Sequence, residues 1–299
     1  MKTDLIYGVE DRPPFKDAIF AALQHLLAIF VAIITPPLII AGALKLDVEK
    51  TSFLVSMSLF VSGISTFIQC KRFGPVGARL LCIQGTSFSF IGPIITTGLM
   101  GGLPLIFGVC MAAAPVEMVI SRTFRYMRNI ITPLVSGIVV LLIGLSLIKV
   151  GVVSCGGGYG AMDNGTFGSW ENLSIAGLVL LSVLFFNRSK NKYLRMSSIV
   201  LGICLGYGLA FALGKVDMSS LNLNLLTSFN IPMPFKYGLD FNISSFIAIG
   251  LVYLITAIEA TGDVTANSMI SGLDIEGEGY VKRVSGGVLA DGFNSFLAG

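Results

Sequence analysis

Long blocks of apolar residues dominate this sequence and limit what it can fold into. Nine blocks are recognisable, at 15–44, 51–70, 79–98, 102–121, 130–150, 172–187, 197–214, 243–261 and from about 284 onward. About 20 such residues form a helix long enough to cross a hydrocarbon core roughly 30 Å thick. Only 12% of the residues are charged, so lipid is the expected solvent. Because unpaired backbone amides cannot face lipid, the blocks predict an all-α polytopic membrane protein.

Most of the Lys and Arg residues lie in the segments on one side of these blocks. One side holds 15 of the 20 Lys and Arg residues, in the N-terminal segment and in the loops near 71–79, 122–128, 188–195 and 282–283. Cytoplasmic loops carry such an excess of Lys and Arg. The pattern therefore predicts a cytoplasmic N-terminus, and it also supports the number of spans.

Several classes of site are disfavoured by what the sequence contains. Its five cysteines lie in or beside apolar blocks without CxxC spacing, which indicates reduced structural thiols. A single histidine gives no second His for a metal site, and the glycines of "CGGGYGAM" lack the Lys of a phosphate loop. No basic and aromatic patch suits nucleic acid. We therefore expect neither an enzyme nor a cofactor, and no nucleic-acid partner.

The third block, "RLLCIQGTSFSFIGPIITTG", contains a polar run from Gln84 to Ser87 at the expected depth of the bilayer. Gly92 and Pro93 follow closely, and this composition is poor for an uninterrupted helix. The run predicts a broken third span, which membrane proteins tolerate where the backbone is buried in protein or lines a cavity. The alternative is a packing face of small residues whose hydroxyl groups bond to their own helix.

The eighth block carries two acidic residues, Glu259 and Asp263, which a continuing helix would place on one face. A charged residue at the centre of a span costs about 2.5 to 3.5 kcal/mol on insertion scales and usually marks an ion or substrate route. Two close carboxyl groups disfavour joint ionisation, which suits one of them to carrying a proton. The alternative is that Asp263 only caps the helix at the cytoplasmic interface.

Two further polar residues lie in apolar blocks. His25 occupies the middle of the first block, where a satisfied core histidine is the alternative to a functional one. Asp291 lies in the ninth block, which has only about 16 residues before Gly299 and no closing basic or aromatic flank. We therefore expect the chain to be an N-terminal portion of a longer protein.

Several motifs resemble those of the nucleobase-ascorbate transporter family, also called nucleobase:cation symporters. They are "EDRPPF", "QHLLAIF", "IQGTSFSF", "ITPLVSGIVVLLIGLSLIKVG", "GGGYGAM" and "GGVLADG". The resemblance runs in the same order over essentially the whole chain, and within the family it is strongest to the bacterial xanthine permeases.

This resemblance implies fourteen spans in two inverted repeats of seven, of which the chain holds a truncated set. A core domain would comprise 1–129, with spans one to four, and 243–299, with span eight and the start of span nine. A gate domain, spans five to seven, would comprise 130–242. The remainder of the second repeat, including a Gln-Asn-x-Gly segment of span ten, is absent from the sequence. Family members are usually homodimers.

The resemblance also implies roles for individual residues. Glu259 matches the acidic residue that accepts N–H bonds from the purine, and Ser87 and Phe88 match positions beside the base. Asp263 matches a carboxylate linked to coupling.

His25 and Asp291 match polar positions that support the site, and Gln84 belongs to the third-span motif next to it. No metal ligands are expected.

The expected function is proton-coupled uptake of a purine nucleobase, above all xanthine, across the bacterial inner membrane by the parent protein. Sodium coupling, and a preference for uric acid, guanine or uracil, stay open at this stage. One alternative is a truncated, transport-inactive membrane protein that acts as an assembly partner. Another is a channel.

Overall fold

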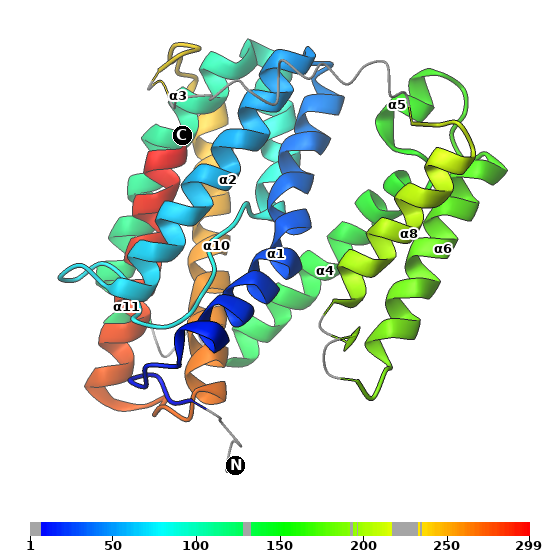
Figure 1. Ribbon diagram of the computed structural model, residues 1–299. Helices are drawn as coiled ribbons and strands as arrows, with labels where there is room; N and C mark the ends of the chain where they lie inside the picture. The colour runs from blue at the N-terminus through cyan, green and yellow to red at the C-terminus, as the bar shows by residue number, and fades with distance from the viewer. Residues whose placement is uncertain (1–6, 128–132, 192–193, 196, 217–232, 234) are drawn as a thin grey trace. The chain divides into compact units, whose positions relative to one another are not determined.

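The computed structural model describes residues 7–127, 133–191, 194–195, 197–216, 233 and 235–299. In this part of the chain the regular elements are all helices (Figure 1). They are α1 (Phe15–Ala43), α2 (Val48–Lys71), the 3-10 helix η1 (Phe88–Phe90), α3 (Ile91–Met127), α4 (Pro133–Cys155), α5 (Gly158–Asp163), α6 (Trp170–Asn187), α8 (Ser198–Ala212), α10 (Ile243–Ile270) and α11 (Gly277–Ala298). The predicted all-α class is thus confirmed.

Among the described residues, four helical segments are long and apolar enough to cross a membrane. They are Val48–Lys71, Phe88–Thr123, Trp170–Asn187 and Ile243–Ile270. Shorter apolar helices cover Ile29–Ala43 and Ser198–Ala212. Most of the expected loop at 215–242 and the start of the expected fifth span lie outside the described residues.

The third and fourth expected spans differ from the simple pair of helices that the apolar blocks suggest. Residues 79–87 form no helix, and α3 runs through the expected boundary between the two spans. At that boundary Gly101 and Gly102 leave the helical conformation, and Gly102 has a φ of 67°. Glycine tolerates this left-handed backbone because it has no Cβ. α3 is therefore two helical stretches joined at a glycine pair.

The chain divides into two compact units. The first comprises Met1–Pro13, Ile33–Ser146 and Met233–Gly299, and the second comprises Pro14–Ala32 and Leu147–Pro232. In the second unit α6 packs on α8. A Cβ at Gly206 would lie 2.3 Å from Cγ2 of Val179, so a glycine is needed at this close helix crossing. The predicted division into core and gate domains stays a prediction.

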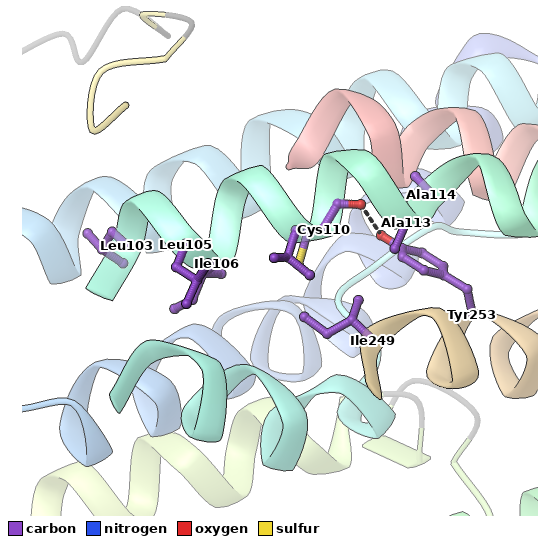
Figure 2. Packing of buried hydrophobic residues seen from close by; sticks show 9 residues of the cluster. Leu103, Leu105, Ile106, Cys110, Ala113, Ala114, Ile249 and Tyr253 are labelled. Atoms are coloured by element: carbon purple, nitrogen blue, oxygen red, sulfur yellow. Dashed lines mark hydrogen bonds between the residues drawn. The ribbon is translucent and has the colours of Figure 1, made fainter. Parts of the chain in front are cut away.

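In the first unit, α3 packs against both α10 and α11, which also contact each other (Figure 1). Figure 2 shows the apolar layer between α3 and α10. Ala113 of α3 and Ile249 of α10 are fully buried there, and the Tyr253 hydroxyl donates a hydrogen bond of 3.2 Å to the Cys110 carbonyl oxygen. Small residues let helices approach closely, which is the main source of packing energy in lipid.

Candidate functional site

A non-helical segment, residues 72–87, joins α2 to η1. Its backbone polar groups find partners on α2: the Gln84 amide donates to Oγ1 of Thr66 at 2.9 Å, and the Ser62 hydroxyl donates to the Gln84 carbonyl oxygen. Buried backbone groups need such partners because water is excluded. The structure therefore shows the interruption that the polar run at Gln84 predicts, and side chains of α2 satisfy it.

Ser87 lies where this segment turns into η1. Its side chain accepts a hydrogen bond from the Ser89 amide at 3.3 Å, which caps the short helix. The Ser87 hydroxyl also donates to Oε2 of Glu259 at 3.5 Å. Phe88, the first residue of η1, is half-buried beside it. The structure thus brings Ser87 of the expected third span to Glu259, the expected acidic residue of α10.

Glu259 and Asp263 lie one turn apart on α10, as the sequence predicts for a continuing helix. Glu259 is half-buried, whereas Asp263 is exposed. The helix continues to Ile270, and its C-cap is Ser271. Asp263 therefore lies well inside α10, and helix capping does not account for its position.

The remaining predicted site residues separate into two groups. Asp291 lies on α11 and is half-buried, and its carboxyl group and that of Glu259 would repel each other if both were ionised. Gln84 is half-buried in the non-helical segment. His25 is exposed on the part of α1 that belongs to the second compact unit, so its supporting role stays a prediction.

Sequence reasoning overlooked two polar residues near these acids. Glu117 of α3 is fully buried, with 0% of its surface exposed. Asn267 of α10 donates a hydrogen bond of 3.0 Å to Sγ of Cys82 in the non-helical segment. The signal for Glu117 was present, because it is the lone charged residue of the fourth apolar block, "GLPLIFGVCMAAAPVEMVIS".

The chemistry available here is hydrogen bonding and proton transfer. Glu259 offers carboxyl oxygens that accept N–H bonds, and Ser87 offers a hydroxyl group that both donates and accepts. These two groups come from α10 and from the start of η1, which are 172 residues apart in the sequence. Such a site suits a small polar ligand that carries N–H donors.

A protein-family model described as "Permease family" matches residues 16–299 of the chain. Xanthine permease XanP of Escherichia coli (strain K12) is 48% identical over 307 residues, which cover 99% of this chain and 66% of that protein. Xanthine permease XanQ of the same strain is 47% identical over 309 residues, which cover 99% of this chain and 65% of that protein.

A more distant relative extends the comparison beyond these two proteins. Nucleobase transporter PlUacP of Paenibacillus larvae is 33% identical over 279 residues, which cover 91% of this chain and 63% of that protein. The chain thus spans slightly less than two thirds of the length of each of these curated relatives.

Proposed function

This chain belongs to the permease family, and on that premise we propose that its whole protein takes up a purine nucleobase, xanthine above all, together with protons. Membership confirms the prediction of a transport protein rather than an enzyme. It also fits the apolar helices, which make this a membrane protein. The names of XanP and XanQ support xanthine as the substrate.

The observation that carries this proposal is the hydrogen bond between Ser87 and Glu259, 3.5 Å long. It joins an interrupted membrane segment to an acidic residue of a second membrane helix. Interrupted helices at membrane depth form the substrate sites of secondary transporters. We therefore assign the base to the space beside these two residues in the transport cycle.

The proposed recognition uses groups that each suit a purine. The Glu259 carboxylate accepts N–H bonds from the base, and the Ser87 hydroxyl takes either role in a hydrogen bond. Phe88 supplies an aromatic ring for stacking. Other contacts are assigned to the rest of the whole protein.

Proton coupling is proposed for the acidic residues around this site. Asp263 follows Glu259 by one turn, and Asp291 lies on α11, which packs against α10. Acidic groups that repel one another bind a proton more readily than isolated ones do. Binding of the base to Glu259 changes how readily these acidic groups bind a proton, so that a proton and the base move together. Gln84 and His25 are proposed as supporting residues.

The topology is proposed from the charge pattern and the family resemblance. The N-terminus faces the cytoplasm, because 15 of the 20 Lys and Arg residues lie on its side of the membrane. The whole protein has fourteen spans in two inverted repeats, a core and a gate, lies in the bacterial inner membrane and forms homodimers.

The experiment is uptake of radiolabelled xanthine by the full-length protein in a host that lacks its own xanthine transport. Glu259→Gln replaces the acceptor with a group of similar shape, and we expect a loss of at least about tenfold in uptake at low xanthine concentration. Glu276→Gln is the matched control, because Glu276 is exposed at the N-cap of α11. Undiminished uptake by the Glu259 variant, at equal protein level, contradicts the role of this residue.

A further inference from the structure

Glu117 has an environment that an ionised carboxylate would not tolerate. Its side chain is fully buried in α3, and neither of its carboxyl oxygens has a hydrogen-bond partner among the described residues. The ion pairs formed by the described residues do not include it. Transfer of an unpaired carboxylate out of water is costly, and the neutral, protonated form avoids most of that cost.

The titratable groups that face Glu117 add negative rather than positive charge. The acidic groups that act on it electrostatically belong to Asp291 of α11 and Glu259 of α10. Tyr253 of α10 is the other titratable neighbour, and its hydroxyl is bonded to the Cys110 carbonyl oxygen. Thr256 of α10 adds one neutral polar neighbour. Two ionised carboxylates at this position would repel each other with little screening.

The backbone holds Glu117 and Asp291 together. A Cβ added to Gly292 would lie 3.2 Å from Cβ of Glu117 and 3.0 Å from the Met118 amide nitrogen. The helices therefore approach closely because Gly292 has no side chain. Asp291 is the residue just before this contact, so helix packing holds its backbone close to that of Glu117.

We propose that Glu117 is a third intramembrane proton site, which holds a proton in this conformation and shares it with Asp291. A protonated carboxyl donates one hydrogen bond and an ionised one accepts it, so a single shared proton satisfies both groups. Helices α3, α10 and α11 thereby bring acidic groups to one region, and Glu259 binds substrate at its edge. The role of Glu117 in the transport cycle rests on the proposed function, whereas its protonation does not.

Infrared spectroscopy of the purified full-length protein in lipid tests the protonation without any transport. A buried protonated carboxyl absorbs above the amide I band, and we expect such a band near neutral pH. It should lose amplitude in Glu117→Gln, shift in frequency in Asp291→Asn, and stay unchanged in the exposed control Glu276→Gln. A spectrum of Glu117→Gln with the full wild-type band would overturn the proposal.

Uptake of xanthine as a function of pH tests the role in transport. In the wild type, the rate of uptake, if limited by a proton-binding step, should change by up to about tenfold per pH unit on one side of the pH at which that site titrates. Glu117→Gln should show lower uptake that varies by less than about twofold over the same range, with a KM within about threefold of the wild type. A merely structural role would leave the shape of the pH profile intact, and that result contradicts the proposal. Absence of xanthine uptake by the wild type would reject the proposed function. The infrared result would still decide whether Glu117 holds a proton.

Discussion

The Ser87 hydroxyl donates a hydrogen bond of 3.5 Å to Oε2 of Glu259, and the same oxygen atom of Ser87 accepts the Ser89 amide at 3.3 Å. Ser87 thus ties the start of η1 to α10 through a single side chain. The bond to Glu259 is long, so its contribution lies at the weak end for a bond to a charged group. Its geometric role is to orient the carboxyl group.

Ser87→Ala should weaken transport without abolishing it. Loss of a hydrogen bond to a charged group costs about 1.5 kcal/mol at the weak end, which corresponds to a rise in KM of roughly tenfold. The measurement is the concentration dependence of xanthine uptake. Ser87→Thr keeps the hydroxyl and should lie closer to the wild type.

Ser58→Ala is the matched control for Ser87→Ala, because among the described residues the Ser58 hydroxyl bonds within α2, to the Val55 carbonyl oxygen at 2.8 Å. Its KM should equal that of the wild type. Equal KM values for Ser87→Ala and Ser58→Ala would show that the contact with Glu259 has no part in binding.

The polar run from Gln84 to Ser87 was sufficient to predict the break in the third span, since a helix of those residues is unfavourable locally. The turn spacing of Glu259 and Asp263 likewise follows from the period of a helix. The contact between Ser87 and Glu259 spans 172 residues, and local patterns carry no information on such pairing. The resemblance to a family implies only that both residues lie beside the base.

Glu117 shows a different limit of sequence reasoning. Its position in an apolar block is visible in the sequence, but a lone acid with no second acidic residue or motif beside it predicts no partner. Its neighbour Asp291 comes from α11, and only the packing at Gly292 reveals the pair.

The end of α10 at Ile270 lies beyond the apolar block that predicted this helix, because polar residues such as Asn267 prolong the helix while contacting protein.

Thr66→Val should destabilise the protein through the non-helical segment. Valine has nearly the same shape as threonine but cannot accept the Gln84 amide, which now bonds to Oγ1 at 2.9 Å. A buried amide without a partner costs about 1–3 kcal/mol, so we expect Tm to fall by about 2–8 °C. The measurement is thermal unfolding in detergent.

Thr96→Val serves as the control for Thr66→Val. Thr96 is exposed, and within the described part of the chain its hydroxyl bonds to the Gly92 carbonyl oxygen of its own helix, at 3.0 Å. Its replacement should change Tm by less than about 2 °C. If Thr66→Val and Thr96→Val lower Tm by the same amount, the bond from Thr66 to the non-helical segment makes no particular contribution to stability.

Replacement by alanine at two glycines in neighbouring helices should change the stability of the protein in opposite directions. A Cβ at Gly286 of α11 would lie only 2.5 Å from the Gly77 carbonyl oxygen, and the Gly77 amide bonds to the Gly286 carbonyl oxygen at 2.8 Å. Gly286→Ala must therefore push backbone against backbone, and we expect a loss of about 1–3 kcal/mol.

Gly250 of α10 has open space where a Cβ would be added. Gly250→Ala should stabilise the protein by about 0.4–1 kcal/mol, because alanine loses less conformational freedom on folding. Thermal unfolding of both variants measures the difference. A stabilised Gly286→Ala protein would contradict the close approach of α11 to the Gly77 backbone.

The start of α2 should lose stability at acidic pH. Asp47, the N-cap, accepts the Lys50 amide at 2.8 Å, and its carboxylate pairs with Nζ of Lys50 at 2.7 Å. These bonds, led by the side-chain bond from Lys50, lower the pKa of Asp47 below its ordinary value of 3.8.

The depressed pKa of Asp47 fixes the sign of its pH dependence. Its contribution to stability is fully present above the ordinary value of 3.8 and is lost as the pH falls through the lower folded-state pKa. Asp47→Ala should therefore have a lower Tm than the wild type at neutral pH, and this difference should shrink at strongly acidic pH. Asp47→Asn keeps a capping oxygen but no charge, so its Tm should lie between the two at neutral pH. A difference between wild type and Asp47→Ala that stays constant down to strongly acidic pH would mean that the charge of Asp47 has no role in holding the start of α2.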